Sequence, residues 1–386
     1  MRGREAFMKI KDLYIYSNVK RSFYHADMEI ENGVITAIGD LMGHYDGFAY
    51  DGGGAYVVPG LVDVHTHGIG GEDWGNATEA GFDKMLSMYA KNGVTSVMPT
   101  ISSAPHGQML SAADKINSFK NDGKRASVIG VHMEGRYLNP EKKGAHAPEL
   151  IAPLTADELE SPILKSCKRL HISAAYELDV SGEFSKKALE IGATLGLAHT
   201  MADYSEAKEA ERRGVTSYTH LFNAMPSLHH RSGGCIAAAF EGNCFAEIIC
   251  DGIHISPEMV RLCYRSLGID RLSLVSDSLD ATGLPDGEYF SSGLPVTVKD
   301  GICRIASGAL AGSTITLDTA VRNLMEFCNI PLTEAILAAT ENPAKQMGAF
   351  NEIGSVEVGK RADMLFLEGS KSLDIRRVMV GGMFVV

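Results

Sequence analysis

The chain has 386 residues and a formal net charge of −12, from 36 lysines and arginines against 48 aspartates and glutamates. This acidic balance excludes nucleic acid and an anionic membrane surface as expected partners, because both require gathered basic residues. The seven cysteines are odd in number and form no Cys-x-x-Cys pair, so we expect free thiols and a cytoplasmic location. No stretch approaches the roughly 18 apolar residues of a membrane span.

Strand-like segments at both ends of the chain predict one small β domain. They are rich in β-branched and aromatic residues, lie between turn signals, and include no helix of useful length. We therefore predict that the two termini pair into a β-sandwich built from residues 1–56 and 349–386. The expected strands are residues 12–16, 26–30, 34–38, 361–367 and 377–380.

Residues 57–348 alternate short apolar strands with amphipathic helices, which is typical of a parallel sheet with helical crossovers. Eight strands are the number that a closed barrel needs, and about 250 residues commonly form one. The segment is therefore predicted to be the α/β catalytic domain, a (β/α)8 TIM-type barrel. The expected strands are residues 57–64, 95–98, 127–133, 170–175, 194–198, 215–218, 245–250 and 272–275, with helices at 77–91, 204–213, 257–267, 317–328 and 333–339.

Side chains that bind metals or carry protons follow these strands, one after another. The loops after barrel strands converge at one rim, so residues that are distant in sequence are expected to meet there. His65 and His67 are two apart on one strand and therefore point to the same side. The series is His65 and His67 after the first strand, Glu134 after the third, His199 after the fifth, His220 after the sixth, His254 after the seventh and Asp277 after the eighth.

Imidazole and carboxylate groups suit a borderline divalent ion, with zinc first and iron, manganese or cobalt as alternatives. Glu134, His199 and His220 make a three-ligand set that leaves a position for water, whose pKa such an ion lowers to about 7. Asp277 is a candidate proton carrier between that water and a leaving group. The alternative role for Asp277 is a helix N-cap after the last strand.

The segments around these residues resemble the amidohydrolase superfamily and, within it, the N-acetylglucosamine-6-phosphate deacetylase family. The resemblance covers essentially the whole chain. The His-x-His pair is common to many amidohydrolases, whereas His-Leu-Phe-Asn-Ala-Met at 220–225 together with Leu-Ala-Gly-Ser at 310–313 is much more specific. The matching segments read His-Thr-His at 65–67, Val-His-Met-Glu-Gly at 131–135, Thr-His-Leu-Phe-Asn-Ala-Met at 219–225, Asp-Gly-Ile-His at 251–254 and Leu-Ala-Gly-Ser at 310–313.

This resemblance implies hydrolysis of the acetamide of N-acetyl-D-glucosamine 6-phosphate, which gives D-glucosamine 6-phosphate and acetate in amino-sugar catabolism. It implies that Asp277 is the general base and acid, and that His146 polarises the acetyl carbonyl. It also implies a homodimer in which the phosphate contacts are completed across the interface. The residues implied to contact the sugar phosphate are Ala145, His146, Asn223, Ala224, Arg231, Asp251, His254, Leu310, Ala311, Gly312 and Ser313.

The same resemblance implies one or two divalent ions per subunit, the catalytic one held by Glu134, His199 and His220. Some members lack one or both histidines of the His-x-His pair and use one ion, whereas members with both can bind two. The presence of His65 and His67 therefore favours two ions, with Glu134 as the bridge between them.

Two alternatives remain open. The first is an amidohydrolase with another N-acyl substrate, D-aminoacylase-like or acting on a different N-acetylated amino sugar, and Arg231 would then have no phosphate to bind. Arg136 stands where members usually have proline, which leaves the exact substrate open. The second alternative is a non-catalytic sugar-phosphate sensor, and the retained proton carrier Asp277 argues against it.

Overall fold

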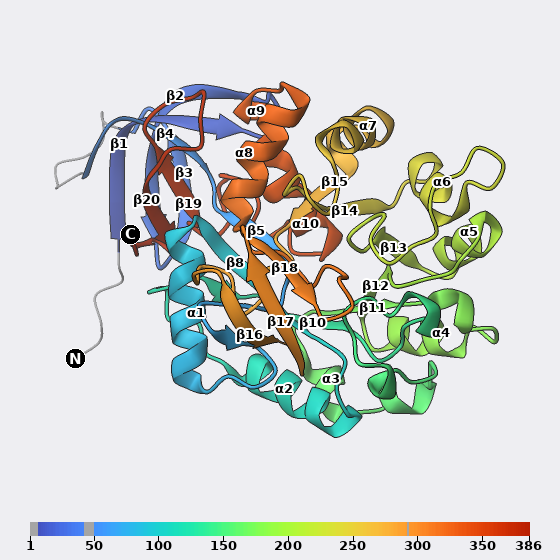
Figure 1. Ribbon diagram of the computed structural model, residues 1–386. Helices are drawn as coiled ribbons and strands as arrows, with labels where there is room; N and C mark the ends of the chain where they lie inside the picture. The colour runs from blue at the N-terminus through green and yellow to red at the C-terminus, as the bar shows by residue number, and fades with distance from the viewer. Residues whose placement is uncertain (1–6, 42–49, 292) are drawn as a thin grey trace.

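A seven-stranded sheet holds both ends of the chain in the computed structural model, which describes residues 7–41, 50–291 and 293–386. Figure 1 shows its N-terminal and C-terminal strands side by side at one edge of the molecule. The strand order is β21-β20-β19-β4-β1-β2-β3, so the predicted pairing of the two termini is confirmed. The strands are β1 (Phe7–Ser17), β2 (Ser22–Glu31), β3 (Val34–Gly39), β4 (Tyr50–Pro59), β19 (Met364–Leu367), β20 (Ile375–Val380) and β21 (Met383–Phe384).

This sheet has an apolar core of its own. Ile10 and Ile15 of β1 are fully buried and belong to one cluster with Met28 of β2 and with Met364 and Phe366 of β19. Residues from opposite ends of the chain therefore stabilise each other, at about 25 cal/mol for each Å² of apolar surface removed from water.

Eight parallel strands follow one another in chain order from β5 to β15 and confirm the predicted barrel. The first and last strands meet where they end, because the Asp277 amide donates to the His65 carbonyl at 2.9 Å. The strand predicted over residues 127–133 is divided into β9 (Ser127–Val128) and β10. The barrel strands are β5 (Leu61–Thr66), β8 (Val94–Ile101), β10 (Val131–Glu134), β11 (Leu170–Ala174), β12 (Ala193–Leu197), β13 (Val215–Tyr218), β14 (Phe245–Ile249) and β15 (Leu272–Val275).

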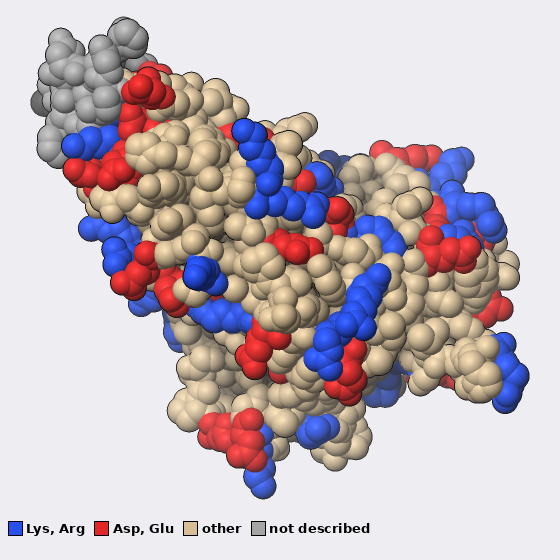
Figure 2. Space-filling view, turned by 90° about the horizontal axis from the view of Figure 1, so that it is seen from above, with Lys and Arg blue, Asp and Glu red and all other residues tan. Residues whose placement is uncertain are grey.

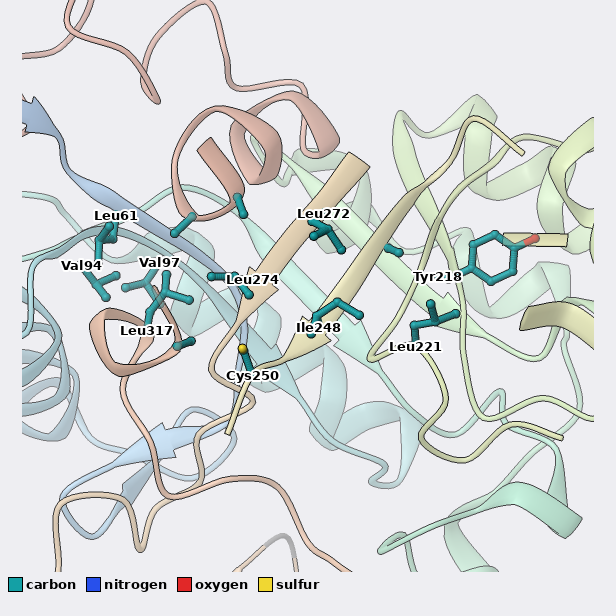
Figure 3. Packing of buried hydrophobic residues seen from close by; sticks show 14 of the residues in the cluster. Leu61, Val94, Val97, Tyr218, Leu221, Ile248, Cys250, Leu272, Leu274 and Leu317 are labelled. Atoms are coloured by element: carbon teal, nitrogen blue, oxygen red, sulfur yellow. The ribbon is translucent and has the colours of Figure 1, made fainter. Parts of the chain in front are cut away.

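Amphipathic helices cover the barrel. In α1 the buried Phe82, Met85 and Tyr89 recur at the three-to-four residue spacing of one helical face. Figure 3 shows the resulting apolar layer, in which Leu274 of β15 and Leu317 of α8 take part. The helices are α1 (Glu79–Lys91), α2 (His106–Ser118), α3 (Pro162–Ser166), α4 (Glu183–Glu190), α5 (Tyr204–Arg212), α6 (Gly234–Glu241), α7 (Pro257–Leu267), α8 (Leu317–Cys328), α9 (Leu332–Ala335) and α10 (Glu341–Gln346).

The prediction of a single strand over residues 57–64 is wrong, because the chain passes from one sheet to the other at Gly60. Val57 and Val58 belong to β4, which pairs with β19, whereas Leu61 begins β5 and pairs within the barrel. A side chain at position 60 would come within 2.1 Å of Thr95 Oγ1, so the crossing point requires glycine. We propose Gly60 as the boundary between the small domain and the barrel, in place of residue 57.

A three-stranded antiparallel sheet is inserted after the last barrel strand and crosses the front of the barrel in Figure 1. Val296 and Cys303 of this sheet pack with Leu279, Ala311 and Ala145 in a separate apolar cluster. The insertion therefore contacts the loops that follow the barrel strands. Its strands are β16 (Gly287–Ser291), β17 (Leu294–Lys299) and β18 (Ile302–Ile305).

The face seen in Figure 2 carries lysines and arginines interspersed with aspartates and glutamates among its described residues. Ion pairs join many of the charged residues of the described chain, such as Lys168 and Arg169 with Glu352 at 2.7 Å. Within the described ranges, no helix combines the length and the apolar character needed to cross a membrane.

Candidate active site

The predicted series of side chains converges where the barrel strands end. His65 lies on β5, Glu134 ends β10, and His199, His220 and Asp277 come directly or almost directly after β12, β13 and β15. All five are buried. The last three adopt positive φ angles of 45°, 33° and 46°, which residues other than glycine seldom adopt. Such backbone persists only where the surrounding structure enforces it, and it concentrates at functional positions.

One oxygen of the Glu134 carboxylate faces two histidines. Glu134 Oε1 lies 2.8 Å from His220 Nε2 and 3.3 Å from His199 Nε2. The two Nε2 atoms are 3.2 Å apart. The structure therefore brings these three side chains, from three different strand ends, around one point.

The other oxygen of the same carboxylate faces the His-x-His pair. Glu134 Oε2 lies 2.9 Å from His67 Nε2 and 3.3 Å from His65 Nε2. Asp277 Oδ1 approaches the same two nitrogens, at 3.3 Å from His67 and 3.6 Å from His65. Glu134 thus stands between two separate histidine pairs, with Asp277 beside one of them.

These separations fit the coordination of divalent metal ions. In a tetrahedral site with bonds of about 2.0–2.1 Å, neighbouring ligand atoms lie about 3.3 Å apart. Two trios of ligand atoms lie within 4.8 Å of one another, one from His65, His67 and Glu134 and one from Glu134, His146 and His199. His65 Nε2 is buried and has no hydrogen-bond partner among the described residues, as expected of an atom that binds a metal.

The protein holds the second ring nitrogen of His199 and of His67. His199 Nδ1 donates to the Lys142 carbonyl at 2.7 Å, and His67 Nδ1 lies 2.8 Å from Ser102 Oγ. A hydrogen bond of this kind fixes the ring orientation and the tautomer, and leaves the lone pair of Nε2 directed at the centre. His220 Nδ1 has no such partner within the part of the chain that the structure describes.

A cavity of about 420 Å³ opens onto these groups. Its volume lies in the range of about 300–1,000 Å³ that is typical of small-molecule sites. Predicted residues make up most of its wall. They are His67, Glu134, Ala145, His146, His199, His220, Asn223, Ala224, His254, Asp277, Leu310, Ala311 and Gly312.

A model of the amidohydrolase family matches residues 56–385 of the chain. The chain belongs to the amidohydrolase family. It is 34% identical to the N-acetylglucosamine-6-phosphate deacetylase of Vibrio furnissii, over 92% of this chain and 89% of the relative. It is 33% identical to the N-acetylgalactosamine-6-phosphate deacetylase of Escherichia coli O157:H7, over 84% of this chain and 86% of the relative.

Solved structures agree with this assignment. The N-acetylglucosamine-6-phosphate deacetylase of Thermotoga maritima aligns with a TM-score of 0.86 at 30% identity, over 98% of this chain and 99% of that chain. A mutant deacetylase of Mycobacterium smegmatis, in complex with N-acetyl-D-glucosamine-6-phosphate, aligns with a TM-score of 0.86 at 28% identity, over 100% of both chains. The barrel with a small β domain is therefore the fold that these hydrolases share.

Three predicted contact residues of this amidohydrolase are not among the residues that line the cavity. Arg231 is exposed, and its guanidinium donates to His230 Nε2 at 2.7 Å. Asp251 instead holds His254, with its Oδ2 2.6 Å from His254 Nδ1. Ser313 holds Asp277, because its amide donates to the Asp277 carbonyl at 2.7 Å. In this single chain, Asp251 and Ser313 support their neighbours rather than face the cavity.

Lys142 and Glu247 are two of the residues beside the site that were not predicted. Lys142 is the one lysine or arginine among the described residues that line the cavity, and it ends a short 3₁₀ helix (Pro140–Lys142) eight residues after Glu134. Glu247 is fully buried in β14, between the apolar residues of that strand. A lone charge inside an apolar strand is a signal that sequence reasoning can use, whereas nothing local distinguishes Lys142 from Lys143.

Proposed function

We propose that this amidohydrolase hydrolyses the acetamide of N-acetyl-D-glucosamine 6-phosphate to D-glucosamine 6-phosphate and acetate, in the breakdown of amino sugars. One observation carries the proposal. A carboxylate–imidazole centre lines a cavity of about 420 Å³ in a chain that is 34% identical, over 92% of its length, to a deacetylase named for this substrate. The seven free cysteines support a cytoplasmic location.

The donor set favours two divalent ions, zinc first and iron, manganese or cobalt as alternatives. Glu134, His199 and His220 would hold the catalytic ion, and His65 and His67 would hold the second. The separate directions of the two Glu134 oxygens support a bridging carboxylate. A bound ion of this kind lowers the pKa of the attacking water and polarises the acetyl carbonyl.

Asp277 carries the proton. Burial by itself would raise the pKa of Asp277, but the neighbouring His65 and His67 outweigh burial and lower it overall, so the side chain starts as a carboxylate. It accepts a proton from the water as the oxygen attacks the acetyl carbon. It then gives that proton to the amide nitrogen as the carbon–nitrogen bond breaks, and the free amine and acetate leave.

His146 stabilises the carbonyl oxygen as negative charge develops on it. Its ring lies in the cavity wall, 4.9 Å from the His199 ring between centroids. Burial, followed by the neighbouring His199, lowers the pKa of His146 to about 3, so the ring is neutral at pH 7. A neutral imidazole N–H is a donor to the oxyanion, a contribution of about 2.7–4 kcal/mol where single donors of this kind have been removed.

The phosphate binds one cation at the cavity wall and a second cation from the partner subunit. Lys142 Nζ donates to the Met225 carbonyl at 2.9 Å, directly beyond Asn223 and Ala224 in the sequence. Lys142 is therefore the cation that the same chain supplies. Arg231 is exposed on its own subunit, and in a homodimer it completes the phosphate site of the partner subunit. Its planar guanidinium can donate two parallel hydrogen bonds to phosphate oxygens.

The test is acetate release from N-acetyl-D-glucosamine 6-phosphate by the zinc-loaded enzyme. We expect the unphosphorylated sugar and an N-acetyl-D-amino acid to be hydrolysed far more slowly, chiefly through a higher KM. We expect Asp277→Asn to retain zinc and substrate while turnover falls by several orders of magnitude. Equal kcat/KM for the unphosphorylated sugar would favour another N-acyl substrate. Substrate binding without acetate release by the parental chain would favour a sensor.

N-acetyl-D-galactosamine 6-phosphate is the second candidate substrate. The relative of Escherichia coli O157:H7 that is named for it is 33% identical to this chain, close to the identity with the glucosamine enzyme. The two sugars are epimers at C4, so the same assay run with both phosphates decides between them by the ratio of their kcat/KM values.

A further inference from the structure

A buried carboxylate lies behind the site and has no place in the reaction described above. Glu247 is in the middle of β14, is fully buried, and carries its charge between Ala246 and Ile248. Among the described residues, the buried lysines and arginines are Lys9 and Lys360, and neither is in the barrel strands. A buried charge without such a partner is costly, so the groups that it contacts must compensate for it.

The contacts of Glu247 lead to both sides of the candidate metal centre. Its Oε2 lies 3.1 Å from His65 Nδ1, and the His220 amide donates to the same oxygen at 3.4 Å. Its Oε1 accepts a hydrogen bond of 2.7 Å from Gln346 Nε2, on α10. The contact with His65 joins β14 to β5 although β15 lies between those strands in the sheet, so it crosses the interior of the barrel.

The contact determines which nitrogen of His65 is free. A carboxylate accepts but does not donate, so His65 Nδ1 carries the proton and donates it to Glu247. His65 Nε2 then keeps its lone pair, is buried, and has no hydrogen-bond partner within the described ranges. It lies 3.3 Å from Glu134 Oε2 and 3.6 Å from Asp277 Oδ1, so a cation held at this nitrogen would face two carboxylates.

We propose that Glu247 is the positioning residue of the second metal subsite, fixing the tautomer and the direction of His65 so that its Nε2 binds the second ion. This inference rests on the two-ion form of the proposed function. Gln346 holds the other oxygen of Glu247 in place, so the carboxylate cannot rotate away from His65. Partners of this kind behind a ligating histidine typically change metal affinity by about 10–100-fold.

The test is the number and affinity of zinc ions in the full chain, measured by elemental analysis after dialysis against graded Zn²⁺ buffers. We expect the parental enzyme to hold two ions per subunit. Glu247→Gln should keep the first ion and lose about 10–100-fold in affinity for the second. In a His65→Ala background, Glu247→Gln should change the second-ion affinity no further, because the two residues act through one contact.

His171→Asn is the matched control. His171 is a buried polar residue of β11, its ring is hydrogen-bonded to Thr194, and among the described residues no hydrogen bond or ion pair joins it to a predicted ligand. This variant should retain both ions. If Glu247→Gln fails to fold, Glu247→Asp serves as a second variant that keeps the carboxylate.

Three results would each overturn the proposal. They are a parental affinity for the second ion in Glu247→Gln, an equal loss of both ions, and a parental enzyme that holds one ion. A failure to release acetate would overturn the proposed substrate alone and leave the metal count to judge Glu247.

Discussion

His199, His220 and Asp277 each adopt left-handed backbone directly at or after a strand end. Conformations of this kind cost of the order of 1–3 kcal/mol each. The cost is offset by hydrogen bonds that hold the turns, such as Asp277 N to the His65 carbonyl at 2.9 Å and Ser313 N to the Asp277 carbonyl at 2.7 Å. At this scale the site is a set of strained residues fixed by their neighbours before any ligand arrives.

His146→Asn separates two roles for this side chain. If His146 donates to the carbonyl oxygen, the variant keeps the parental zinc content and KM, while kcat falls by about 10²–10³-fold. Steady-state kinetics and zinc analysis on the same preparation measure both quantities. A lost ion would instead make His146 a ligand, as its place within 4.8 Å of Glu134 and His199 allows. His106→Asn, a change at the start of α2 and outside the cavity wall, is the control and should leave both values unchanged.

At the scale of elements, the loop at 310–313 and the turn after β15 form one unit. Gly312 has a φ of 53°, and a Cβ at this position would lie 2.9 Å from the Asp277 carbonyl oxygen and 2.9 Å from a Leu279 methyl group. The loop therefore packs directly against the backbone of Asp277, the proposed proton carrier. Its neighbours Leu310 and Ala311 line the cavity, so one loop contacts both the substrate space and Asp277.

Gly312→Ala should displace this loop. Left-handed backbone costs alanine about 1–2 kcal/mol, and the close contact adds to that cost. We expect a lower Tm, a raised KM and a reduced kcat, measured by thermal unfolding and acetate release. Gly308→Ala is the matched control, because Gly308 also has a positive φ of 87° but a Cβ there meets nothing within 4 Å. Equal effects of the two variants would mean that strain alone, and no contact with Asp277, accounts for the loss.

The site residues at the strand ends could be predicted from the sequence, because the active-site residues of a barrel lie where its strands end. His65, Glu134 and His220 could be assigned in this way without knowledge of any side-chain contact. The division at Gly60 could not, since the apolar run continues through it and only the side chain of Thr95 forces glycine there. The role of Glu247 depends on a partner 182 residues away, a contact that no local pattern encodes.

Whole-molecule organisation decides how Arg231 can act. The segment around it is exposed, and the neighbouring Leu228 leaves 41% of its surface accessible. An exposed apolar side chain beside a guanidinium suits an isologous interface, in which each subunit presents the same patch to the other. The phosphate site of one subunit would then be incomplete without the other.

Mixed dimers test this arrangement. Asp277→Asn and Arg231→Ala subunits, each poorly active alone, should recover about a quarter of the parental activity after unfolding and refolding together. The reason is that half of the random dimers then contain one site with Asp277 from one chain and Arg231 from the other. Acetate release before and after mixing measures the recovery. No gain on mixing would place Arg231 in the site of its own chain, or outside the site altogether.

The bond between the Asp277 amide and the His65 carbonyl also bears on how the enzyme matures. The ribosome adds His65 about 210 residues before Asp277. For most of translation the growing chain therefore has an open sheet edge and only part of its metal-binding groups. Closure of the barrel must therefore wait until the last barrel strand, β15, has left the ribosome. The cavity, which Asp277 lines, is then complete only late in the synthesis of the chain.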